Sequence, residues 1–284
     1  MNKALLSAAA ALLSCSTAFA DSNSSWWSVG KADDSAAEFA LAPDGYKDFV
    51  ISDFGYEDRR YIIGVSQPGS DCPYVLAGPD DEWGGTGGAA GWRTHEVNIL
   101  FRVDKLKKNA AAEVVIDILG CAPNGAVLKA AINGLEQRFE LKGESSEVIY
   151  GKPATAPRRT LRMAVDRAHL KPYGNALTIS VVQGGWVCFD CIAMEGRGAT
   201  IDTTPHSLFV RNVAPADYEL TTDNRRVQPL LVDVEHVSGS PTLRVVVDGN
   251  ELFAQRLDTA RYVMEVPMPA VNRAKKSRYA VYAD

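Results

Sequence analysis

The distribution of hydrophobic and polar positions along this chain is typical of half-buried β-strands. In residues 96–103 apolar side chains occupy every second position, at Val97, Ile99, Phe101 and Val103. Residues 160–165 and 176–181 repeat this alternation. Short runs with a period of two, separated by Gly, Pro and Asn, are characteristic of sandwiches and jelly rolls. We therefore expect an all-β chain whose main unit is a jelly-roll β-sandwich.

Turn signals divide the chain into two β domains. Asn133-Gly134 lies between two strand-like runs and predicts a two-residue hairpin. Residues 196–206 are polar and rich in Gly and Thr, so we expect a linker there. A jelly-roll domain over 26–195 would precede it, and a smaller sandwich-like domain over 207–284 would follow. In the second domain Asp248-Gly249 predicts another hairpin, whose loop we expect to exceed the minimal length.

Helical periodicity is nearly absent from the sequence. Only residues 35–39 and 103–107 could form short helical turns. The final run, residues 278–284, reads as a strand with no successor. We therefore expect the second domain to be truncated and the natural product to continue.

The first residues have the pattern of an export signal. Lys3 supplies positive charge, a short apolar run follows, and residues 18–20 (AFA) form a small-residue cleavage site. The apolar run is too short to span a membrane. We expect residues 1–20 to be removed and the protein to reach the periplasm or the cell surface. The alternative is a lipid anchor at Cys15, because the residues before it loosely resemble a lipoprotein box.

The composition narrows the choice of partners. The chain has 30 Lys and Arg against 35 Asp and Glu, a formal net charge of −5. A mildly acidic chain without basic clusters argues against nucleic acid as a partner. Its 284 residues suffice for one large or two ordinary domains.

Four cysteines follow the leader, at positions 72, 121, 188 and 191. Export permits disulfides, but four in this length are too few to form a framework. Cys188 and Cys191 have the C-x-x-C spacing of zinc and redox sites. They fall on opposite faces of a strand, and three strand steps separate their Cα atoms by ~10 Å, beyond the reach of a disulfide. We expect buried free thiols there, while a bridge between Cys72 and Cys121 stays open.

No sequence motif indicates catalysis. The chain has no G-x-S-x-G elbow, no phosphate-binding loop and no dinucleotide fingerprint. None of its four histidines has the spacing of a zinc site. Paired carboxylates for glycoside cleavage cannot be selected from the scattered acids, because their separation is a three-dimensional quantity.

Residues 72–95 form the candidate binding segment. Trp83 and Trp92 flank a Gly-rich stretch, and acids stand beside Trp83. Sugar rings stack their apolar faces on aromatic rings, while their hydroxyls pair with charged and amide groups. The candidate carbohydrate-binding residues are Tyr74, Asp81, Trp83, Trp92 and Arg93.

Two other interpretations of this segment stay open. Asp80, Asp81 and Glu82 could hold a structural calcium ion, because hard cations prefer carboxylate oxygens. Otherwise both tryptophans close the ends of the sandwich and the acids face water. No cofactor other than calcium is expected.

Four segments in the same order resemble one known family. They are residues 26–39 (WWSVGKADDSAAEF), 70–83 (SDCPYVLAGPDDEW), 95–104 (HEVNILFRVD) and 170–195 (LKPYGNALTISVVQGGWVCFDCIAME). They are similar to the carbohydrate-binding-like third domain of rhamnogalacturonan lyases, polysaccharide lyase family 4. The resemblance implies a jelly-roll sandwich of the galactose-binding-like type. It also implies an accessory role, because the catalytic residues of those lyases lie in another domain. Trp186 and Asp190 match the family pattern as structural positions.

The second half resembles a further β module. Residues 208–220 and 226–249 look like the N-terminal extension of large exported carbohydrate-active enzymes of gut Bacteroidetes, including alpha-mannosidase-like hydrolases. This resemblance implies that the chain is the front of a longer enzyme.

The function expected from the sequence is non-catalytic. It is carbohydrate binding, or the positioning of an exported polysaccharide-degrading enzyme, with a glycan and a catalytic domain of the same chain or system as partners. The enzyme alternative is a fragment of a polysaccharide lyase or of a glycoside hydrolase such as an alpha-mannosidase. The third alternative is a structural spacer without a ligand.

Overall fold

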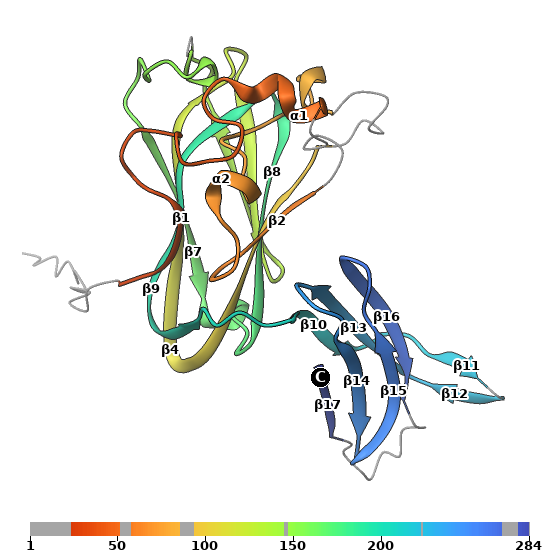
Figure 1. Ribbon diagram of the computed structural model, residues 1–284. Coiled ribbons are helices and arrows are strands. Elements are labelled where there is room, and N and C mark those ends of the chain that lie inside the picture. Colours follow the sequence, from red (N-terminus) through yellow and green to blue (C-terminus); the bar gives the residue numbers. More distant parts are fainter. Residues whose placement is uncertain are drawn as a thin grey trace, which may run out of the picture.

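The computed structural model describes residues 24–51, 58–85, 94–144, 147–222, 224–268 and 278–283. The leader, including Cys15, lies outside the described residues. The described chain is almost entirely β, as the alternation predicts. Figure 1 shows a large two-layered unit followed by a smaller one. We call β1–β9 the first module and β10–β17 the second module.

The first module contains one continuous sheet of nine strands within the described residues. Its strands are β1 (Ser24–Gly30), β2 (Arg59–Ile62), β3 (Val75–Leu76), β4 (Val97–Cys121), β5 (Ala126–Ile132), β6 (Leu135–Leu141), β7 (Arg159–Asp166), β8 (Gly174–Gly184) and β9 (Val187–Asp202). Its short helical segments are α1 (Asp48–Ile51), α2 (Pro68–Asp71) and the 3-10 turns η1 (Gly45–Lys47), η2 (Glu82–Gly84), η4 (Val148–Tyr150) and η5 (Arg167–His169).

The long strand β4 joins the two layers of the sandwich. Its residues 97–102 pair with β8, and residues 97–100 also pair in parallel with β2. Its residues 111–118 lie between β7 and β9. Register shifts between Leu106 and Ala111 mark the bend between these parts, as β-bulges do. The helical turn expected over 103–107 is therefore wrong, because these residues belong to β4.

The alternating residues of β4 fill the core between the layers. Val97, Ile99, Phe101 and Val103 are all buried, and Trp27 packs against Phe101 with 5.4 Å between ring centroids. Burial of these apolar faces is the main force that holds the layers together. The sandwich predicted from period-two alternation is confirmed.

The second module has two three-stranded sheets and one strand pair. Its strands are β10 (Leu208–Pro215), β11 (Leu220–Thr222), β12 (Arg225–Val227), β13 (Pro229–His236), β14 (Thr242–Val247), β15 (Asn250–Arg256), β16 (Arg261–Pro267) and β17 (Tyr279–Ala283). The sheet β10-β13-β16 and the sheet β15-β14-β17 enclose a second core. The last strand pairs backwards with β14.

Both hairpin signals are located where the sequence predicts them. Asn133 and Gly134 have φ of 46° and 90° and connect β5 to β6. Asp248 and Gly249 have φ of 50° and 86°, and Val247 pairs directly with Asn250. The second loop is thus a minimal two-residue turn, and the expectation of a longer loop is wrong.

Two further details differ from the expectations. Strand β9 continues to Asp202, so the first part of the 196–206 linker is strand. Cys72 and Cys121 are free thiols, so the bridge left open between them is not formed. Cys188 and Cys191 are also buried and free, and they belong to clusters on opposite faces of β9, as expected.

Candidate functional site

Four aromatic rings gather at one end of the sandwich. Tyr46 and Phe49 each pack edge-on against Trp83, with ring centroids 5.2 and 5.5 Å apart. Tyr46 also packs against Tyr150, at 5.5 Å. We call these four residues the aromatic end. Edge-to-face packing at these distances stabilises aromatic clusters beyond the burial of their area.

Short one-turn segments from three parts of the chain bring these rings together. Tyr46 comes from η1, Trp83 from η2 and Tyr150 from η4. The segment after η4 approaches the η1 segment so closely that a Cβ at Gly151 would lie 2.6 Å from the Cβ of Pro43. Gly151 also has a φ of +71°, so glycine is required there for two reasons.

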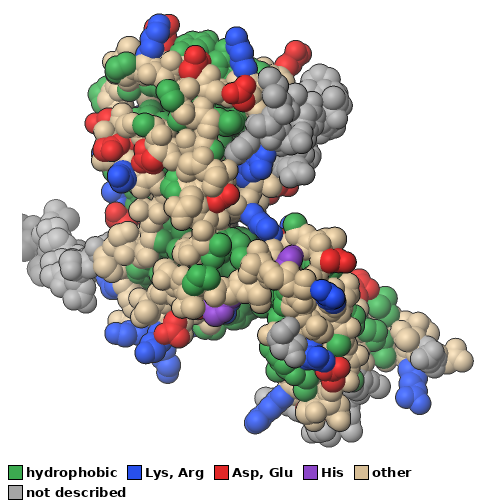
Figure 2. Space-filling view, in the orientation of Figure 1, with side chains coloured by type: hydrophobic (Ala, Val, Ile, Leu, Met, Phe, Trp, Pro, Cys, Tyr) green, Lys and Arg blue, Asp and Glu red, His purple; other side chains and the backbone are tan. Residues whose placement is uncertain are grey.

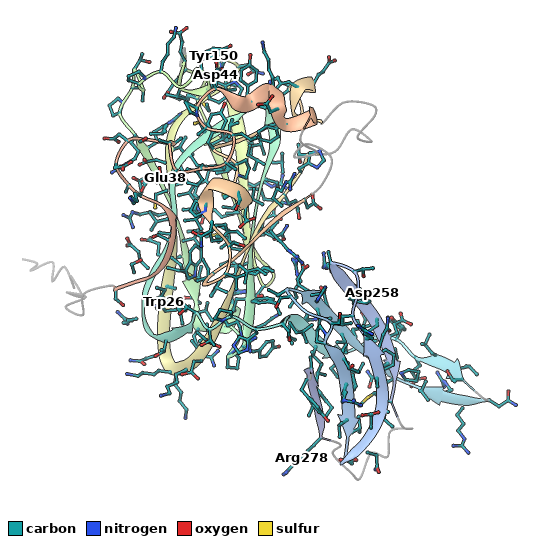
Figure 3. The ribbon with its side chains drawn as sticks, in the orientation of Figure 1. Trp26, Glu38, Asp44, Tyr150, Asp258 and Arg278 are labelled. Atoms are coloured by element: carbon teal, nitrogen blue, oxygen red, sulfur yellow. The ribbon has the colours of Figure 1, made fainter. Side chains whose placement is uncertain are left out.

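The rings differ in how much surface they offer. Phe49 is buried, Tyr46 and Trp83 are half-buried, and Tyr150 is 48% exposed. Lys47 holds its ammonium 5.6 Å from the Tyr46 ring centroid. Figure 3 labels Tyr150 beside Asp44 at the end of the sandwich far from the second module. The aromatic end thus combines exposed ring surface with charged neighbours.

Asp81 holds the Trp83 side chain in place through a hydrogen bond. It is only 9% exposed, and its carboxylate accepts a hydrogen bond of 2.9 Å from the Gly78 N–H and another from the Trp83 indole N–H. Burial raises the pKa of Asp81 to about 6. Its oxygens therefore orient Trp83 instead of facing a ligand.

The acids beside Trp83 do not converge. The Asp80 carboxylate accepts a hydrogen bond of 2.6 Å from the Asn124 amide, and Glu82 is exposed on η2. Within the part of the chain that the structure describes, no three His, Cys, Asp or Glu side chains could hold a metal ion together. Calcium at Asp80, Asp81 and Glu82 has no support in this geometry.

A cleft of about 330 Å³ adjoins the aromatic end. Pro43, Val148 and Lys152 are among its lining residues, and Tyr74 lies in its wall. Tyr74 is only 1% exposed, and its hydroxyl donates to the Ile149 carbonyl at 2.7 Å. Tyr74, expected as a surface contact, is therefore a core residue that positions η4.

The remaining predicted site residues lie elsewhere. Trp92 and Arg93 are outside the described residues. Of the Gly-rich stretch between the tryptophans, Gly84 and Gly85 are buried, and a His95 ring nitrogen lies 3.2 Å from the Gly85 carbonyl. These two glycines are thus packed against the fold.

Sequence reasoning missed Tyr46 and Tyr150. Both stand next to glycine in short segments, GYK at 45–47 and VIYG at 148–151. An aromatic residue beside a turn glycine is the signal that could have identified them, because such turns lie at the surface.

A polar cleft of about 550 Å³ lies between the two modules. Glu235, only 4% exposed, accepts from Arg60 at 3.1 Å and from Arg211 at 2.6 Å. Arg211 also donates to Asn98 of β4 at 3.0 Å. Because each charge in this network has a partner of opposite charge or a hydrogen-bond acceptor, we assign the network to the docking of the modules.

Comparison with known families identifies the first module. The family described as CBM-like, polysaccharide lyase family 4, domain III matches residues 25–194. No curated protein matches the chain. Among the described residues, no helix is long and apolar enough to cross a membrane.

Solved structures give weaker similarities. A family GH115 4-O-methyl-alpha-glucuronidase with specificity for decorated arabinogalactans is 17% identical, with 36% of this chain and 14% of that chain covered and a TM-score of 0.23. A GH2 beta-galacturonidase from Eisenbergiella tayi is 6% identical over 66% of this chain and 28% of that chain, with a TM-score of 0.19. Beta-glucuronidase 3 of Bacteroides uniformis is 7% identical over 66% and 26%, with a TM-score of 0.20. The chain thus spans less than a third of the length of these enzymes.

Proposed function

The chain belongs, through residues 25–194, to the CBM-like family of polysaccharide lyase family 4, domain III, and from this membership we propose that it binds a glycan as a non-catalytic module. A carbohydrate-related accessory module is what the family match supports. The aromatic end is the observation that carries the finer proposal. It supplies the ring faces and polar neighbours that a sugar needs.

The chemistry of the aromatic end suits a pyranose ring. The exposed face of Tyr150 and the half-buried rings of Tyr46 and Trp83 offer apolar surface to the C–H face of a sugar. Lys47 and Lys152 lie on the neighbouring turns and can donate hydrogen bonds to hydroxyls. Aromatic surface with a few polar groups is the usual composition of a small-ligand site.

The proposal also covers the cellular location of the module and the catalytic domain that works with it. The pattern of residues 1–20 supports export to the periplasm or cell surface, with a lipid anchor at Cys15 as the alternative. We propose that the glycan brought to this surface is cleaved by a catalytic domain of the same longer chain or system. Detection of the processed chain by mass spectrometry of periplasmic and membrane fractions would distinguish cleavage after Ala20 from lipidation at Cys15.

Glycan binding by the full chain, measured on a glycan array and by affinity gel electrophoresis, tests the proposal. Tyr150→Ala removes the most exposed ring and is expected to weaken binding at least tenfold. Trp83→Ala is expected to do the same, and circular dichroism shows whether it folds. The matched control is Tyr218→Ala, which removes a tyrosine that is 40% exposed on the second module.

Two results would refute the proposal. One is the absence of binding to every glycan tested. The other is equal binding by the Tyr150→Ala and Tyr218→Ala variants.

A further inference from the structure

A second cleft, of about 320 Å³, lies between the two modules. Its lining residues include Arg102 of β4, Tyr173, Val210 and Val213 of β10, and Tyr279 and Val281 of β17. The volume is within the range of small-ligand sites. In Figure 2 hydrophobic side chains gather along the notch between the modules, on the side where β17 lies.

The close approach of the modules forms this cleft. A Cβ added to Gly174 would lie 1.9 Å from the carbonyl oxygen of Val210. Only glycine permits this contact between β8 and β10. The walls of the cleft therefore come from both modules, which are in close contact at Gly174.

Two tyrosines, one from each module, line the cleft. Tyr173 is 37% exposed and Tyr279 is 44% exposed. Tyr279 shares a strand face with Val281, and both side chains line the cleft. Burial raises the pKa of Tyr173, and the Tyr279 hydroxyl raises it further. Neither hydroxyl has a protein partner among the described residues.

The charge at the cleft is positive. Arg102 is the one charged residue among the described residues that line it. Its Nε lies 3.5 Å from Asp202 and its Nη1 donates to the Leu208 carbonyl at 3.3 Å, so among the described residues Nη2 has no partner. Asp202 has other partners, the Thr204 N–H at 2.9 Å and His206 at 3.0 Å.

Lys171 places a second cation beside Tyr173, although it does not itself line the cleft. Its ammonium lies 5.9 Å from the Tyr173 ring centroid and donates to the Arg211 carbonyl at 3.1 Å and to the Asn212 side-chain oxygen at 3.2 Å. Two fixed cations beside unpartnered hydroxyls complement an anionic group. A guanidinium binds a carboxylate or a sulfate through paired N–H donors.

We propose that this cleft is a second saccharide site, which takes a pyranose unit carrying an anionic group. The ring of the sugar lies against Tyr173 and Tyr279, and the anion faces Arg102. The anion is a carboxylate or a sulfate, and the experiment distinguishes the two. The proposal does not depend on the aromatic end.

Isothermal titration of the full chain tests the site with three disaccharides: one with a uronic acid, one sulfated and one neutral. At least one anionic probe is expected to bind ten times more tightly than the neutral one. Tyr279→Ala is expected to weaken that binding at least tenfold. Tyr282→Ala is the matched control, because Tyr282 is a tyrosine of β17 that is 45% exposed and lies on the opposite strand face.

Arg102→Gln is expected to abolish the preference for the anionic probe. Arg102 also donates to the Leu208 carbonyl, so the Arg102→Gln variant could fail to fold. In that case the comparison of Tyr279→Ala with Tyr282→Ala tests the site. Equal affinity for the three probes, no binding at all, or equal effects of Tyr279→Ala and Tyr282→Ala would overturn the site. Tyr150→Ala is expected to leave binding in the cleft unchanged, which separates this proposal from the aromatic end.

Discussion

At the residue scale, polar residues of the family-like segments maintain the fold. Asn175 is fully buried, its amide donates to the carbonyls of Lys171 and Tyr173, and its oxygen accepts from the Asn133 amide. Asp190 is also fully buried, and it accepts from Arg158 at 2.8 Å. The interpretation of Asp190 as structural agrees with this placement. Polar groups without water must be hydrogen-bonded, so these positions tolerate few substitutions.

Asp81 makes a testable contribution to the pH dependence of stability. Its pKa in the folded chain is about 6, above the ordinary value of 3.8, so the folded state binds its proton more tightly than the unfolded state. The stabilisation that the protonated Asp81 carboxyl contributes to the folded state is therefore fully present below pH 4, and it is lost as the pH rises towards 6. We expect the free energy of unfolding to fall by roughly 3 kcal/mol through this group.

Asp81→Asn should remove this dependence between pH 4 and 6.5, as measured by urea unfolding at several pH values. Glu82→Gln, which changes an exposed acid next to it, is the control and should retain the wild-type slope. An unchanged slope in the Asp81→Asn variant would contradict the assignment.

At the element scale, the strands and hairpins follow from local sequence. Alternation identified the buried face of β4, and Asn-Gly and Asp-Gly identified two turns with positive φ. Residues 103–107 were expected as a possible short helical turn, but pairing with β9 makes them part of β4. The aromatic end was only partly predictable, because one-turn segments such as η1 and η4 have no periodicity.

Gly249→Ala tests the turn between β14 and β15. A Cβ there meets no atom within 4 Å, so only the φ of +86° opposes the substitution. We expect a loss of about 1 kcal/mol, measured by chemical unfolding. Gly69→Ala, in α2 with ordinary contacts, is the control and should cost less. Equal effects of the two substitutions would argue against strain at the turn.

At the scale of the whole molecule, the modules dock through an apolar cluster beside the charged network. Phe209 of β10 is 1% exposed and packs with Ile62 and Leu100 of the first module. These three side chains exclude water next to the pairs that Glu235 makes with arginines. Burial of the apolar cluster favours this junction, and the arginines give the buried Glu235 carboxylate its partners.

Phe209→Ala should loosen this junction. A buried phenylalanine replaced by alanine costs roughly 3 to 5 kcal/mol. We expect a single calorimetric transition of the full chain to split into two, with the second module unfolding first. Leu252→Ala, at a residue that is 40% exposed on β15, should leave the transition unsplit. A single transition in both variants would show that the cluster does not couple the modules.

The long bent strand β4 has a consequence for how the chain acquires its structure. Because its two ends belong to different layers, a slip of one residue along β4 would turn the wrong side chains inward on both sheets at once. Only a change at the bulged bend between Leu106 and Ala111 would let one layer misalign while the other stays correct. This bend therefore decides whether an error in the assembly of the sandwich spreads to both layers or stays in one.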